Sequence, residues 1–187
     1  MRGVEVTTRE IETPIVTHIG RAVTEDQAQE RGKWSFYRGF HKALELYHLD
    51  RVLTDEMAMA QTCTRGRIIL VEGCMDVARL VQSGQENCLA SFGATLSEAQ
   101  LSRLELLRQT LGISEVLLFF DRDDAGQKAT ETVRGMLRAA NWQVQAFDWS
   151  APLGQRQGHP IVIPDALTDP AELSEAQIQW LAENNRI

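Results

Sequence analysis

Two short acidic motifs each follow an apolar run in this sequence. Glu72 and Asp76 belong to the first motif, and Asp121 and Asp123 stand two residues apart in the second. Crowded carboxylates repel one another unless a cation lies between them, and such hard oxygen ligands suit Mg²⁺ or Mn²⁺. An ion of this kind binds phosphate oxygens and neutralises charge that develops during phosphoryl transfer. The two motifs therefore predict a divalent-metal site that acts on phosphates.

A plainer interpretation of the same acids is that they do no chemistry. In that case Asp123 and Asp124 are solvated, with Asp124 capping a helix over 125–140, and Glu72 only ends a strand. A lone Asp-x-Asp favours this interpretation, but a second acidic motif after a second buried strand weakens it. On the pattern alone, both interpretations stay open.

The segments around the motifs predict the frame that positions them. Residues 67–72 and 115–121 are short apolar runs rich in β-branched and aromatic residues, which is typical of buried parallel strands. Further strands are expected at 87–92 and 143–149, with helices over 75–82, 97–109 and 125–140. The alternation predicts an α/β fold with a mostly parallel sheet covered on both faces. Ligand crevices of such sheets lie at the carboxyl ends of the strands, where both acidic motifs fall.

The flanking segments carry weaker signals. Residues 40–53 show helical spacing of apolar residues, while 54–65 fits either a helix or a loop. The remaining expected elements are a short strand at 15–19, a loop or short helix capped by Thr24 over 24–30, a short strand at 161–163 and a final helix over 174–184.

The segment 31–42 is basic and aromatic, with four Lys or Arg residues, no acid and four interleaved aromatic residues. Lys33, Arg38 and Lys42 can contact phosphates, and Trp34 or Tyr37 can stack on bases. An amphipathic connector with its aromatic rings in the core explains the same pattern, so both interpretations stay open for this basic aromatic strip.

Composition limits the class of protein. The chain has 187 residues with 43% hydrophobic residues, enough for a buried core, and a net charge of −7. That charge argues against duplex binding by bulk charge, although a local basic strip can still hold a nucleic-acid backbone. Three cysteines without a C-x-x-C pair indicate neither a disulfide framework nor a zinc finger. With no membrane-spanning run or signal peptide, we expect a soluble cytoplasmic protein that has no membrane partner.

The motifs resemble those of a known family, the Toprim domains of bacterial DNA primases of the DnaG type. Residues 71–77, VEGCMDV, resemble the V-E-G-Y-M-D-V glutamate motif, and residues 120–129, FDRDDAGQKA, resemble the D-x-D-x-A-G-x-x-A motif. The intervening ASFGAT at 90–95 is similar to the primase A-S-L-G-T-x loop. Upstream, FHKALELYHL at 40–49 is similar to F-H-K-G-x-x-L-Y-G-L. The resemblance runs from about residue 20 to residue 173.

The resemblance implies a Toprim fold of about four mostly parallel strands sandwiched by helices. It implies that Asp121 and Asp123 are the principal Mg²⁺ (or Mn²⁺) ligands, with Asp76 in support. Glu72 would be a metal ligand or a proton-transfer group, and Lys42 would lie near the nucleotide or template. The expected organisation is a primase-like extension with helical and loop segments at 1–66, a Toprim catalytic domain at 67–173 and a C-terminal helix at 174–187.

One motif departs from the family pattern. Primases carry a third acidic pair, D-P-D, whereas this chain has Asp169-Pro170-Ala171-Glu172. Asp169 is expected to be a metal ligand, and Glu172 would approach from another direction than the missing second aspartate. The resemblance also leaves out the zinc-binding domain, the basic half of the polymerase core and the helicase-binding region of primases.

Three functions fit these observations. The first is primase-like nucleotidyl transfer, in which nucleoside triphosphates are joined on single-stranded DNA, with Glu72, Asp121 and Asp123 as catalytic residues. The second is a Toprim nuclease that hydrolyses phosphodiesters. The third is a non-catalytic module that binds single-stranded DNA or RNA or a replication partner. The expected protein partners are a separate basic or zinc-binding primase domain, or a helicase.

Overall fold

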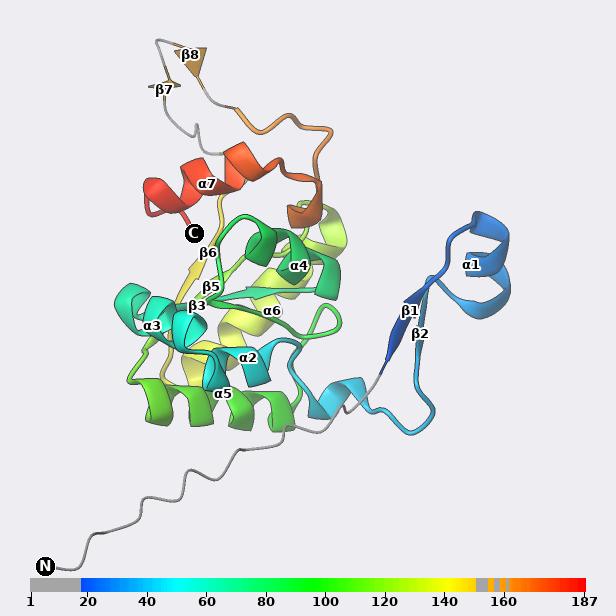
Figure 1. The fold of residues 1–187 in the computed structure, drawn as a ribbon, viewed down its shortest axis with the longest axis horizontal. Coiled ribbons are helices and arrows are strands. Elements are labelled where there is room, and N and C mark those ends of the chain that lie inside the picture. The colour runs from blue at the N-terminus through cyan, green and yellow to red at the C-terminus, as the bar shows by residue number, and fades with distance from the viewer. Residues whose placement is uncertain (1–17, 151–154, 157–158, 161) are drawn as a thin grey trace, which may run out of the picture. The chain divides into compact units, whose positions relative to one another are not determined.

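A computed structural model describes residues 18–150, 155–156, 159–160 and 162–187 (Figure 1). The chain divides into two compact units, Met1–His41 and Lys42–Ile187. Within the described residues, no helix combines the length and apolar character needed to cross a membrane.

The small unit contains an antiparallel pair of short strands, β1 (Ile19–Arg21) and β2 (Trp34–Phe36), joined through helix α1 (Glu25–Arg31). The Thr24 hydroxyl accepts the amide N–H of Gln27, which confirms Thr24 as the helix N-cap. The strand predicted at 15–19 lies mostly outside the described residues. Strand β2 falls inside the basic aromatic strip, for which no strand was predicted.

The large unit is built on a four-stranded parallel sheet, as predicted. Its strands are β3 (Arg67–Val71), β4 (Cys88–Ala90), β5 (Glu115–Leu118) and β6 (Gln143–Ala146), in the order β4-β3-β5-β6. Leu70 pairs with Leu89 on one side and with Leu118 on the other, so β3 and β5 are central neighbours. Their carboxyl ends, each followed by an acidic motif, therefore lie side by side.

Two hydrophobic layers cover the two faces of the sheet, because side chains alternate along each strand. Ile68 and Leu70 pack in a cluster with residues of α2 (Leu49–Thr54), α5 (Glu98–Leu111) and α6 (Asp124–Ala139). Ile69 and Val71 pack in the other cluster with residues of α4 (Cys74–Gln82) and α7 (Glu175–Glu183). Figure 1 shows this layered arrangement in the large unit. The predicted α/β fold with helices on both faces is confirmed.

The segment before β3 differs from the prediction. The helix expected over 40–53 is replaced by a 3₁₀ turn, η1 (Lys42–Leu44), and the later helix α2. Tyr47 breaks the helix because its backbone pairs with Ala90 at the edge of β4, and His48 then takes a left-handed conformation with φ 73°. The undecided residues that follow form α3 (Glu56–Arg65), which the Asp55 carboxylate caps.

The C-terminal part adds a small pair of strands, β7 (Gln155–Arg156) and β8 (His159–Pro160), and the 3₁₀ turn η2 (Pro170–Glu172) before α7. Residue 161 of the predicted strand lies outside the described residues, and Val162 and Ile163 are not in a strand. Ile163 is instead buried in the core cluster on the α7 side of the sheet, whereas Val162 is exposed.

Gly126 allows α6 to start close to the carboxyl end of β5. A Cβ atom at this position would lie 2.2 Å from the main-chain oxygen of Asp121, so no larger residue fits without movement. The same helix contains Gly135, around which a Cβ would meet nothing within 4 Å.

We expect Gly126→Ala to lower the free energy of unfolding by about 1–3 kcal/mol, because it forces α6 away from Asp121. The matched control Gly135→Ala should raise it by about 0.5–1 kcal/mol through better helix propensity. Urea denaturation of both variants measures the difference. Equal stability of the two variants would contradict the close approach at Gly126.

Candidate metal centre

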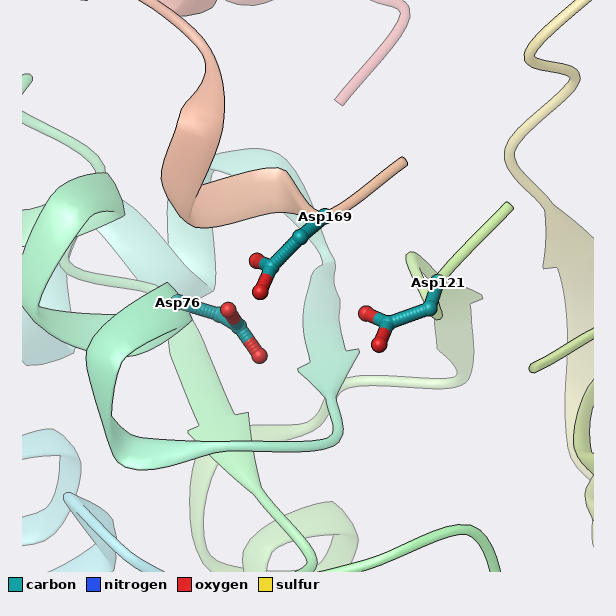
Figure 2. Close-up of side chains that lie close together, drawn as sticks. All are labelled: Asp76, Asp121 and Asp169. Carbon is teal, nitrogen blue, oxygen red and sulfur yellow. The ribbon is translucent and has the colours of Figure 1, made fainter. Parts of the chain in front are cut away.

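Three carboxylates from three separate segments converge at the carboxyl ends of the strands. Asp76, Asp121 and Asp169 each offer an oxygen, and these oxygens lie within 4.8 Å of one another. Figure 2 shows the three side chains pointing toward one another from the start of α4, the end of β5 and the segment before η2. This acidic cluster has the oxygen-only donor set that suits a hard divalent cation.

Asp76 is the most buried member of the acidic cluster, with 4% of its surface exposed. It is the third residue of α4, and its Oδ2 accepts the Gly73 N–H at 2.8 Å, which fixes the carboxylate at the start of the helix. Burial, a hydrogen bond with Asp169 and the charge of Asp169 raise the pKa of Asp76 to about 9. Burial and the neighbouring Asp169 therefore disfavour the ionised form of Asp76.

Asp169 enters the acidic cluster from the turn that precedes η2. Its Oδ1 accepts the Ala171 N–H at 2.7 Å. Glu172 turns back and accepts the N–H groups of Thr168 and Asp169 through Oε2, at 2.9 and 3.4 Å. The Glu172 carboxylate therefore caps its own turn, and Ala171 carries no side-chain oxygen, so the third acidic motif gives the cluster only Asp169.

Asp121 lies three residues after the end of β5, beyond the buried Phe119 and Phe120. The preceding residue, Phe120, is buried, and its carbonyl accepts the indole N–H of Trp149 at 3.0 Å. The Asp121 N–H points to Glu72 Oε1 at 3.4 Å. The ends of the two central strands are therefore linked through the Glu72 side chain.

Glu72 and Asp123, which the sequence predicted as metal ligands, are not among the three carboxylates that converge. Burial raises the pKa of Glu72, and the charges of Asp123 and Asp169 raise it further, against the lowering effect of the Asp121 N–H. Asp123 is the N-cap of α6, with its Oδ1 accepting the Gly126 N–H at 2.7 Å, so the expected cap at Asp124 is wrong by one residue. The charges of Asp123 and Asp169 thus both act on the carboxyl group of Glu72.

The basic aromatic strip is divided between the two units. Lys33 and Arg38 are exposed in the small unit, and Lys42 is exposed in η1 of the large unit. The Lys42 carbonyl accepts an N–H from the Gln100 side chain at 3.1 Å, which ties η1 to α5.

The aromatic residues of the strip contribute mainly to local packing. Trp34 lies under the guanidinium of Arg21 at 5.4 Å, and Phe36 stacks on Phe40 at 5.5 Å. Tyr37 is 68% exposed. Of the two rings predicted to stack on bases, Tyr37 is therefore the more accessible.

Comparison with known proteins shows which protein family this part of the chain resembles. Residues 66–147 match the profile of the Toprim domain. The chain is 40% identical over 90 residues to a DNA primase of Pseudomonas putida, a match that covers 48% of this chain and 12% of the primase. The chain thus spans only a small part of the length of this curated relative.

Solved structures agree on the fold. The crystal structure of the zinc-binding and RNA polymerase domains of the Aquifex aeolicus primase matches with a TM-score of 0.63 at 24% identity, covering 92% of this chain and 36% of that one. A DnaG primase catalytic domain bound to ssDNA matches with a TM-score of 0.58 at 23% identity, covering 92% of this chain and 46% of that one.

Residues 66–147 thus match the Toprim domain, and the parallel sheet with its acidic carboxyl edge lies largely within this segment. The segment is similar in sequence to part of bacterial DNA primases and similar in fold to solved primase domains.

Asp76→Asn tests the electrostatics of the cluster. Because the folded-state pKa of Asp76 lies above the value of about 3.9 in an unfolded chain, the free energy of unfolding of the metal-free protein falls as pH rises from about 4 to about 9. The asparagine can still accept the Gly73 N–H but never ionises. We expect the variant to be more stable by about 1 kcal/mol or more at pH 8, and its advantage to shrink toward pH 4.

Urea denaturation in EDTA at pH 4 and pH 8 measures this difference. Asp50→Asn, at an exposed position of α2, is the control and should change stability little at either pH. An Asp76→Asn variant with the same pH dependence as the parent would show that Asp76 titrates normally.

Proposed function

We propose that this chain supplies the acidic catalytic site of a primase-like nucleotidyltransferase, which joins nucleoside triphosphates on single-stranded DNA in the presence of Mg²⁺ or Mn²⁺. The convergence of Asp76, Asp121 and Asp169 at the carboxyl ends of the strands carries this proposal. The similarity of the same segment to DNA primases supports the choice of reaction.

The donor set fits a hard cation. Three carboxylate oxygens within 4.8 Å leave their negative charge poorly compensated, as the raised pKa of Asp76 indicates. In the proposed site Asp76, Asp121 and Asp169 hold the ion, with Asp123 and Glu72 as further ligands at its edge. When bound, the metal would lower the pKa of an attacking hydroxyl and stabilise the negative charge of the leaving pyrophosphate.

The side chains of this chain then have separate roles. Glu72 is partly buried and has a raised pKa, which suits it to hold or transfer a proton at its carboxylate. Asp121 and Asp123 are aligned by the end of β5 and the start of α6, so the phosphates meet a rigid edge of the sheet. The exposed Lys42, Arg38 and Lys33 contact the phosphate backbone or the incoming nucleotide.

Partner domains complete the proposed enzyme. The Aquifex aeolicus primase structure joins zinc-binding and RNA polymerase domains, and a related DnaG catalytic domain has been solved with ssDNA bound. We propose that a basic domain, a zinc-binding domain or a helicase works together with this site.

A single assay tests the function. The chain is incubated with single-stranded DNA, labelled nucleoside triphosphates and Mg²⁺ or Mn²⁺, and the products are separated by size. We expect new oligonucleotides, which Glu72→Gln and Asp121→Asn should each reduce at least about 100-fold because each removes a charge from the reacting site. A shortened template would favour a nuclease instead, and no product with metal binding intact would contradict autonomous synthesis.

The basic aromatic strip is tested by binding. We expect Arg38→Ala combined with Lys42→Ala to weaken binding of single-stranded DNA, because two phosphate contacts are lost, and to reduce the slope of log affinity against log salt by about 1.4. Fluorescence anisotropy at several salt concentrations measures both. Lys128→Ala, which removes one cation from α6, is the control, and unaltered binding by the double variant would assign the strip to packing.

A further inference from the structure

Asp169, the third carboxylate of the acidic cluster, depends on contacts of its own segment to stay in place. Asp169 belongs to a short turn, whereas Asp76 lies in helix α4 and Asp121 lies in the short segment between β5 and α6. Carboxylates that lie within 4.8 Å of one another repel whenever they are ionised, and neither Asp121 nor Asp169 lies in a helix or a strand. Contacts made by the rest of its segment must therefore offset the repulsion.

Arg122 ties this segment to the end of β5. Its main-chain N–H donates to the Thr168 carbonyl at 2.7 Å, directly before Asp169. Its guanidinium donates to the Asp165 carboxylate at 2.6 Å and to the Pro164 carbonyl at 3.4 Å. The residue between Asp121 and Asp123 thus binds the segment that carries Asp169.

Arg79 ties the same segment to α4. Its Nε donates to the Ala171 carbonyl at 3.2 Å, and its Nη1 donates to Gln82 Oε1 at 3.1 Å. Arg79 lies on α4, the helix that carries Asp76, three residues further along. Arg79, on the same helix as Asp76, and Arg122, next to Asp121, therefore both donate hydrogen bonds to the segment that contains Asp169.

We propose that Arg122 and Arg79 are positioning residues that hold Asp169 within reach of the cation bound by Asp76 and Asp121. The inference rests on the proposed function, because it concerns the same metal site. The hydrogen bonds described above run from the guanidinium groups to Asp165, Gln82 and main-chain carbonyls, so the arginines act on the segment and not on the metal.

The direction in which metal affinity changes when either arginine is removed distinguishes a positioning role from a direct effect of its charge. An arginine close to a cation site repels the cation, so its removal should tighten metal binding if charge alone matters. Positioning predicts the opposite, because loss of the tether lets Asp169 move away from the other two carboxylates. Loss of such supporting contacts typically weakens metal binding about 10- to 100-fold.

Isothermal titration of the full chain with Mn²⁺ tests the inference. We expect Arg122→Ala and Arg79→Ala each to weaken Mn²⁺ binding about tenfold. Arg122→Lys should recover part of the loss through its remaining contact with Asp165, and Asp165→Ala should reproduce part of it. Arg134→Ala is the matched control, since it removes a guanidinium of α6 whose ion-pair partner is Glu131, and it should leave the affinity unchanged.

Thermal unfolding of each variant is recorded alongside, and the folded variants should differ little because ion pairs near the surface contribute little to stability. Unchanged or tighter Mn²⁺ binding by both Arg122→Ala and Arg79→Ala would overturn the inference. If Asp121→Asn still abolished binding in that case, the proposed metal site would stand without it. A parent chain that binds no Mn²⁺ would overturn the metal site and the inference together.

Discussion

The close approach of three carboxylates, which repel one another when ionised, is the constraint that the rest of the domain must satisfy. Asp76, Asp121 and Asp169 are held close enough for a single ion to contact all three, and one of them is almost fully buried. A fold does not gain stability from this arrangement, since desolvation and like charge both raise the pKa of Asp76. The rest of the domain must therefore provide the rigidity that keeps the acids together until a cation neutralises them.

The parallel sheet supplies most of that rigidity. Strands β3 and β5 are central neighbours with apolar side chains buried on both faces, and each delivers an acidic motif at its carboxyl end. Capping then fixes the directions of the acids: Asp76 binds the Gly73 N–H, and Asp123 binds the Gly126 N–H. Gly126 lets α6 approach the backbone of Asp121. Thus the hydrogen bonds that start the two helices also orient the acids of the site.

Much of this could be predicted from sequence, because local pattern determines it. The continuous apolar runs ending at Glu72 and Asp121 predicted two buried parallel strands, and the motif order indicated a primase-type Toprim domain. That the two strands are neighbours came only from the structure. The helix expected over 40–53 was wrong because pairing of Tyr47 with the edge of β4 is non-local. The N-cap was misplaced by one residue because both Asp123 and Asp124 are good capping residues. No spacing rule pointed to Arg79 or Arg122, since their partners lie far along the chain and are mainly main-chain carbonyls.

If Asp76, Asp121 and Asp169 form one metal site, a divalent ion should bind among their carboxylates, and its position in a crystal can be measured. Crystals of the chain soaked in Mn²⁺ and measured at the manganese absorption edge would give an anomalous difference map. We expect a peak within coordination distance of Asp76, Asp121 and Asp169, and we expect Asp121→Asn to abolish it. A fully soaked crystal with no peak among these side chains, or with the manganese bound at another place, would contradict it.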